Sequence, residues 1–138
     1  MKIVKISVWT VVITSLFIMT ARSNTNTHKG ETDLLFHTWI LDSYVMAGKK
    51  YPPGKKEQED YILFNEDLTY FSKSEGKEEG GTYILNTNGA YVLMIDKKGE
   101  KIKAYIISIS KQSLVLKYDF DEIKDIEMHY KRSILIKD

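Results

Sequence analysis

Three histidines are the first candidates for chemistry, because imidazole binds metal ions and moves protons near neutral pH. His28 lies in a polar N-terminal segment, whereas His37 and His129 lie in segments of alternating apolar residues. The alternation places His37 on the inner face and His129 on the outer face of the expected sheet. Histidines on opposite faces do not share a metal ion, and the chain has no Cys to add thiolate ligands. We therefore expect neither a metal site nor a cofactor.

Other potential catalytic groups lack the spacing that catalysis needs. The sequence has no Gly-x-Ser-x-Gly motif, and no motif links its serines to a base and an acid. Acidic pairs occur at Glu66-Asp67, Glu78-Glu79 and Asp121-Glu122, with both members adjacent in sequence. Turn formation explains such pairs, whereas a glycosidase needs carboxyl groups that face each other across a cleft. We therefore predict a non-enzymatic protein.

Tyrosines are the most informative set of side chains. The chain has 9, and most of them are spread over separate apolar segments. Strand propensity explains this distribution without any function. If several point into one interior, however, their hydroxyl groups need partners or a polar ligand. Such an interior would favour an amphipathic or aromatic ligand over a plain acyl chain. The tyrosines in question are Tyr61, Tyr70, Tyr83, Tyr91, Tyr105, Tyr118 and Tyr130.

The N-terminus has the features of a secretory signal peptide. Lys2 and Lys5 precede a short apolar run, and residues 21–23 form a small-x-small cleavage pattern. We predict that residues 1–23 are removed and that the mature chain begins near Asn24. The alternative is an uncleaved membrane anchor, although the apolar core is shorter than the ~20 residues that span a bilayer. Without Cys the chain has no lipidated N-terminal Cys, so we expect an exported periplasmic or extracellular protein that is not a lipoprotein.

The charge of the mature chain argues against nucleic acid as a partner. The whole chain has 20 basic and 19 acidic residues. Loss of Lys2, Lys5 and Arg22 with the signal peptide leaves 17 basic residues and a formal net charge of −2. A nucleic-acid-binding domain usually carries a marked basic patch instead. We expect no nucleic-acid partner and no stable membrane span after cleavage.

Short strand patterns alternate with turn signals beyond a flexible lead-in at residues 24–33. Residues 32–36 could form one helical turn, and residues 75–80 read as a longer solvated connection. Asn88-Gly89 is a strong hairpin signal. We predict strands at residues 37–46, 58–65, 68–74, 81–86, 90–96, 101–109, 112–119 and 124–133.

Eight such strands indicate an all-β fold, an eight-stranded antiparallel up-and-down barrel over residues 34–134 with a tail at 135–138. Closure removes exposed sheet edges, and an eight-stranded barrel is filled by side chains or holds one small ligand. A two-sheet sandwich is the alternative. Charge alternation then assigns inner faces. These comprise Trp39, Leu41, Ser43 and Val45; Ile102, Ala104, Ile106 and Ser108; Leu114, Leu116 and Tyr118; and Ile126, Met128, Tyr130 and Arg132.

Several short motifs follow the signal peptide in a characteristic order, at residues 34–41, 64–70, 81–85, 113–116 and 130–132. This order resembles that of the small lipocalin-like domain proteins exported by Gram-negative bacteria. In lipocalins a Gly-x-Trp motif lies in the first strand and a late Arg packs over the Trp. The resemblance assigns these structural roles to Trp39 and Arg132, which would form a cation–π contact. His37 stands where the motif has Gly.

The resemblance implies that the barrel binds a small apolar or amphipathic molecule. The loop at residues 47–56 would be a lid over the barrel mouth or a solvated connector. The alternative function is that of a filled barrel acting as a protein-interaction module, namely an inhibitor, immunity or envelope-assembly factor with an envelope protein partner. A void of ~300 Å³ or more would favour ligand binding. The predicted ligand-binding residues are Leu41, Tyr51, Tyr70, Tyr83, Leu93, Ile106, Leu116 and Met128.

Overall fold

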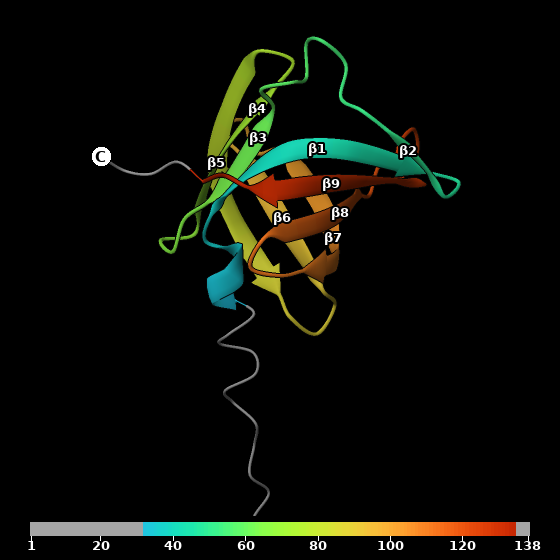
Figure 1. The fold of residues 1–138 in the computed structure, drawn as a ribbon. Coiled ribbons are helices and arrows are strands. Elements are labelled where there is room, and N and C mark those ends of the chain that lie inside the picture. Colours follow the sequence, from blue (N-terminus) through green and yellow to red (C-terminus); the bar gives the residue numbers. More distant parts are fainter. Residues whose placement is uncertain (1–31, 135–138) are drawn as a thin grey trace, which may run out of the picture.

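A closed antiparallel barrel accounts for residues 32–134, which are the residues that the computed structural model describes (Figure 1). The strands follow chain order around the sheet, and β1 pairs with β3 on one side and with β9 on the other, which closes the barrel. The predicted all-β, eight-stranded up-and-down barrel is therefore confirmed, with β2 as a short extra strand on β1. The strands are β1 Thr38–Met46, β2 Lys49–Tyr51, β3 Tyr61–Phe64, β4 Thr69–Ser74, β5 Lys77–Asn86, β6 Tyr91–Asp96, β7 Lys101–Ile109, β8 Ser113–Tyr118 and β9 Ile126–Arg132.

Both chain ends extend beyond the described residues. The predicted signal peptide at residues 1–23, most of the lead-in and the tail at residues 135–138 lie outside them. The described chain starts with a helical turn at residues 32–35, as the sequence predicts for this region. Within residues 32–134, no helix has the length and hydropathy of a membrane span.

The connection between β4 and β5 is shorter than the sequence predicts. Residues 77–80 continue β5 and pair with residues 71–74, so only Glu75 and Gly76 form the turn. Both have a positive φ, 49° and 83°. Such turns match the right-handed twist of the flanking strands. The prediction of a longer solvated connection at residues 75–80 is wrong, because its charged residues are the exposed side chains of a hairpin.

The expected lid loop is also partly a hairpin. Ala47 and Gly48 make a tight turn with positive φ, and β2 returns along β1. Tyr51 pairs with Tyr44 in this extension. The free loop is therefore restricted to residues 52–60, and β3 begins at Tyr61 rather than at residue 58. Figure 1 shows this loop arching from β2 to β3.

Two bulges change which side chains face inward. The β1–β9 ladder skips Asp42, and beyond it Tyr44 rather than Val45 packs against the core. The β7–β8 ladder skips Ile107. An extra residue in one strand shifts the alternation by one position. The predicted inward positions of Val45 and Ser108 are therefore wrong, whereas the other apolar members of those two sets lie in or against the core.

Figure 1 shows the helical turn at one end of the barrel, and the core side chains near this turn pack against one another. Trp39 is fully buried there, and its indole Nε1 donates a hydrogen bond to the Leu35 carbonyl over 3.0 Å. The rings of Phe64 and Tyr83 meet edge to face with centroids 5.0 Å apart. We call this region the filled half; its buried members are Leu35, Trp39, Phe64, Tyr83, Val92, Ala104, Leu114 and Leu116.

Candidate functional site: a cavity in one half of the barrel

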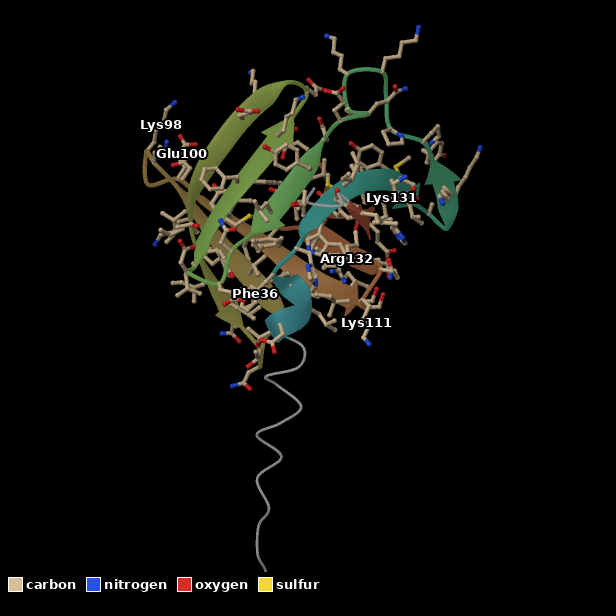
Figure 2. The ribbon with its side chains drawn as sticks, turned by 60° about the vertical axis from the view of Figure 1, so that its left-hand side comes forward. Phe36, Lys98, Glu100, Lys111, Lys131 and Arg132 are labelled. Atoms are coloured by element: carbon tan, nitrogen blue, oxygen red, sulfur yellow. The ribbon has the colours of Figure 1, made fainter. Side chains whose placement is uncertain are left out.

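A cavity of about 410 Å³ lies in the rest of the interior and reaches solvent at the barrel end opposite the helical turn. Each of the eight barrel strands contributes at least one side chain to its wall. Lys98 and Glu100, in the turn between β6 and β7, lie away from Phe36 and the helical turn, which mark the filled half (Figure 2). We call the part of the barrel that surrounds the cavity the cavity half. Its apolar and aromatic lining consists of Leu41, Tyr44, Tyr61, Ile62, Tyr70, Met94, Ile102, Tyr118, Phe120, Ile123, Met128 and Tyr130.

Several hydroxyl groups are polar groups of the cavity wall, and three of them belong to Tyr70, Tyr118 and Tyr130; the others belong to Tyr44, Tyr61, Ser72 and Ser74. The hydroxyls of Tyr118 and Tyr130 hydrogen-bond to each other over 3.0 Å. Tyr130 also donates to the Sδ of Met128 over 3.6 Å. The third hydroxyl, that of Tyr70, is buried and has no hydrogen-bond partner within residues 32–134. A buried unpaired hydroxyl is costly in free energy, so it marks a position that a ligand group can satisfy.

These hydroxyls are protonated at neutral pH, since an ordinary tyrosine already has a pKa of 10. Burial is the main cause that raises the pKa of Tyr70, of Tyr118 and of Tyr130 further. The negative charge of Glu79 raises the pKa of Tyr70 further. At neutral pH all three groups are therefore neutral hydroxyls, which donate and accept hydrogen bonds rather than act as bases.

Charged side chains gather at the cavity rim. Asp60 is 7% exposed, and its carboxylate accepts a hydrogen bond from the Glu75 amide over 2.9 Å. Burial raises the pKa of Asp60, as do the nearby Glu57 and Glu75 carboxylates, against the opposing effect of that hydrogen bond. Lys73 pairs with Glu59 over 2.8 Å. The charged residues that line the cavity are Asp60, Lys73, Glu75, Lys77 and Glu79.

The loop at residues 52–60 is tied to the barrel at the rim. Tyr44 donates its hydroxyl hydrogen to Glu57 Oε1 over 2.9 Å, and Glu57 Oε2 accepts from the Gly54 amide over 2.7 Å. At its far end the Asp60 carbonyl accepts from the Leu41 amide over 2.9 Å. The segment is therefore fixed to the barrel, and its last residue, Asp60, lines the cavity.

Comparison with known proteins agrees with this barrel. A family model described as a lipocalin-like domain matches residues 35–116, more than half of the chain. The chain belongs to the lipocalin-like domain family. The family predicted from the sequence motifs is thereby confirmed.

Two solved structures from Bacteroides uniformis ATCC 8492 share the lipocalin-like fold of this chain. A crystal structure of a lipocalin-like protein is 17% identical, covers 72% of this chain and 99% of its own, and has a TM-score of 0.55. An NMR structure of a protein from the same organism is 16% identical, covers 73% of this chain and 90% of its own, and has a TM-score of 0.57. No curated protein matches the sequence.

The lipocalin-like barrel places three of the predicted ligand-binding residues at the cavity: Leu41, Tyr70 and Met128. Five others do not line it. Tyr83 and Leu116 are fully buried in the filled half, and Ile106 packs against the core. Tyr51 belongs to β2, outside the barrel interior.

Leu93 is placed on the outer face, which corrects its predicted interior position. It pairs with Ile84, which is 56% exposed, while the flanking Val92 and Met94 are buried. Tyr44, Ile62 and Met94 line the cavity although they belong neither to the predicted ligand-binding residues nor to the predicted inner faces. Ile102, Tyr118 and Tyr130 line it and face inward as predicted, but they are not among the predicted ligand-binding residues. For Tyr118 and Tyr130, the abundance of tyrosine in the strands was the sequence signal that pointed to the interior.

The Trp39–Arg132 contact differs from the one expected of lipocalins. The two residues lie directly opposite each other in the β1–β9 ladder. Within residues 32–134, however, the cation–π pairs are formed by lysines, and none joins Arg132 to the Trp39 ring. His37 instead packs its ring edge against Trp39, with centroids 6.0 Å apart. Burial lowers the pKa of His37 and the Arg132 charge lowers it further. Figure 2 shows Arg132 at the same end as Phe36.

The remaining histidine of the described chain is His129, on the outer side of β9. Its Nε2 lies 3.0 Å from Glu127 Oε2. Within residues 32–134 no group of three or more His, Asp or Glu side chains is arranged to hold a metal ion.

Proposed function

We propose that this lipocalin-like protein is exported and binds a small amphipathic molecule in its barrel, without catalysing a reaction. The supporting observation is the cavity of about 410 Å³, whose wall combines apolar and aromatic side chains with several hydroxyl groups. Binding pockets for small molecules typically have volumes of about 300–1,000 Å³ and a few polar groups on a mostly apolar wall. A filled barrel, as the protein-interaction alternative requires, would lack this space.

The chemistry of the lining supports binding rather than catalysis. Tyr70, Tyr118 and Tyr130 keep their protons at neutral pH, because the ordinary tyrosine pKa is 10 and burial raises it further. The buried carboxylate at the rim, Asp60, is held by the Glu75 amide. No lining group is paired with a second one in the way that a nucleophile is paired with its base.

Native mass spectrometry of the mature chain, isolated from its own envelope fraction, tests ligand binding directly. We expect a mass above that of the bare chain and release of a small organic molecule on solvent extraction. N-terminal sequencing of the same sample tests export, with Asn24 expected near the start. A chain that still begins at Met1 would contradict signal cleavage.

A matched pair of substitutions tests whether the cavity is the binding site. Ser72→Phe places a ring at a half-buried position that lines the cavity, whereas Thr82→Phe adds the same ring on the exposed face of β5. Titration with the neutral fluorescent dye Nile red measures binding to each variant. We expect Ser72→Phe to weaken dye binding at least tenfold and Thr82→Phe to leave it unchanged. Equal binding by both variants would place the dye elsewhere and contradict the proposal.

A further inference from the structure

We propose that the cavity selects an uncharged ligand that carries a hydroxyl group, and that the Tyr70 hydroxyl is the group that recognises it. This inference rests on the proposed function, since it names the ligand chemistry of the same cavity. It is carried by the pattern of paired and unpaired hydroxyls and by the positions of the charged side chains.

The Tyr70 hydroxyl has a hydrogen to donate and no acceptor for it. Tyr70 is 2% exposed, lines the cavity, and its oxygen has no hydrogen-bond partner within residues 32–134. Folding therefore removes this hydroxyl from bulk water without replacing the lost hydrogen bonds by protein ones. The oxygen itself is covered in this structure, so a small turn of the ring toward the cavity would bring it within reach of a ligand. An acceptor oxygen on the ligand would then recover the lost hydrogen bond and be selected over a purely apolar molecule.

The neighbouring tyrosines explain why a hydroxyl fits better than a carbonyl. The Tyr118 and Tyr130 hydroxyls share one hydrogen bond over 3.0 Å in which either can be the donor, and Met128 Sδ is a second acceptor for Tyr130. Tyr118 lines the cavity together with Tyr70, so its hydroxyl offers a ligand either a free acceptor site or a free hydrogen. A ligand hydroxyl can accept from Tyr70 and pair with Tyr118 in both cases, because it donates as well as accepts, whereas a carbonyl can only accept.

The charges around the cavity disfavour an anionic ligand. Within residues 32–134, the charged side chains that line the cavity are three carboxylates, Asp60, Glu75 and Glu79, and two lysines, Lys73 and Lys77. Lys73 is paired with Glu59, and Lys77 is exposed to solvent, so neither lysine is a buried counter-ion. A carboxylate ligand would pass a mainly acidic rim and lose its hydration beside neutral tyrosines, which is costly without a buried counter-ion. A free fatty acid therefore fits this cavity poorly.

Three rigid probes of nearly equal size test the inference: naphthalene, 2-naphthol and 2-naphthoate. Their affinities for the whole mature protein are compared at pH 7 by isothermal titration calorimetry, with Tyr70→Phe as the test variant. Tyr83→Phe is the matched control, since it removes the hydroxyl of another buried tyrosine outside the cavity. Thermal melting and near-UV circular dichroism confirm that both variants are folded.

We expect the unaltered protein to bind 2-naphthol about tenfold more tightly than naphthalene, and 2-naphthoate most weakly. In Tyr70→Phe the preference for 2-naphthol should fall to about twofold or less, with naphthalene binding retained; Tyr83→Phe should keep the full preference. A preference that survives Tyr70→Phe, or tighter binding of 2-naphthoate, would overturn the inference and leave the proposed function standing. If none of the probes binds to any variant, the proposed function itself fails.

Discussion

The filled half and the cavity half of the barrel share the same eight strands but treat their buried polar groups differently. In the filled half the Trp39 indole and the Tyr83 hydroxyl both donate to backbone carbonyls, those of Leu35 and Asn65. In the cavity half the Tyr70 hydroxyl has no partner within the described chain. Paired buried groups stabilise a fold, whereas an unpaired one reduces its stability and suits a binding site. The barrel thus separates stability and binding along its length.

The two ends of the barrel also differ in the lengths of the connections between strands. A helical turn and three short connections, at residues 65–68, 87–90 and 110–112, surround the filled half. Two longer segments, at residues 52–60 and 119–125, border the cavity. These longer connections leave room for a mouth, whereas the charged rim comes mainly from the β4–β5 hairpin, with Asp60 as the one charged lining residue of the two long segments. Loops carry binding functions because a rigid sheet holds their ends in place.

The largest difference in unfolding free energy between the two halves should appear when one buried leucine in each half is replaced by alanine. Leu116 is fully buried in the filled half, and Leu41 is nearly as buried but borders the cavity. Leu116→Ala leaves a new hole among packed atoms and should lower the free energy of unfolding by about 3 kcal/mol. Leu41→Ala enlarges an existing space and removes fewer contacts, so we expect about half that loss. Urea denaturation measures both, and equal losses would show that the two halves are packed alike.

A second pair of variants compares the hydroxyl groups. Tyr83→Phe removes the shorter of two hydrogen bonds to the Asn65 carbonyl, at 2.7 Å, and leaves the one from the Leu68 amide at 3.2 Å, so it should cost about 1 kcal/mol of unfolding free energy. Tyr70→Phe removes an unpaired hydroxyl and should leave stability unchanged or raise it. Denaturation in the absence of added ligand gives both values. If Tyr70→Phe were the more destabilising variant, its hydroxyl would have a partner and the proposed contrast would be wrong.

Ionisation of the Tyr83 side chain offers an independent check on the filled half. Burial, followed by the charges of Asp67 and Glu66, raises the pKa of Tyr83 to about 12. The raised value means that the folded state resists loss of the proton, so stability should fall as the pH rises above the ordinary tyrosine value of 10. Tyr83→Phe should show a smaller fall than the unaltered protein when the melting temperature is followed from pH 9 to pH 11. Parallel curves for the two proteins would contradict this.

Much of the fold follows from the local sequence pattern. The residues that were predicted on the wrong face of the sheet share a common cause. Period-two alternation located the eight barrel strands because each inner face must bury apolar side chains. The bulges at Asp42 and Ile107 leave no such mark, since they arise where closure fixes the register between strands. Positions beyond a bulge, such as Val45 and Ser108, were therefore assigned to the wrong face. The error is one of pairing, which involves residues far apart in the chain.

The cavity could be predicted only in part, for a related reason. Leu93 and its neighbours are apolar on both faces of β6, so alternation could not decide which side chains point inward. The positions of Tyr70 and Tyr83 look alike in sequence, as both are inward-facing strand tyrosines. They differ because the Asn65 carbonyl accepts a hydrogen bond from Tyr83 and no described group does so for Tyr70. Which half is hollow depends on the summed side-chain volumes, which no local pattern reports.

The smallest expected effect concerns Asp60 at the boundary between the rim and the interior. Burial is the main cause that raises its pKa above the ordinary value of 3.8. A carboxyl group with a raised pKa binds its proton more tightly in the folded state, so stability falls as the pH rises through this window. Asp60→Asn keeps an oxygen to accept from the Glu75 amide and removes the charge. We expect this variant to be slightly more stable than the unaltered protein at pH 7.

The pH dependence of that difference separates charge from packing. The gain from Asp60→Asn should shrink as the pH falls toward 3.8, because the unaltered carboxyl group then takes up its proton in the folded protein. Comparing melting temperatures of the two proteins at each pH removes the contributions of the other carboxyl groups. A gain that stays constant with pH would assign the effect to packing. A loss of stability at pH 7 would instead mean that the charge holds the loop at residues 52–60 in place, and the rim would then belong with the stabilising half of the barrel.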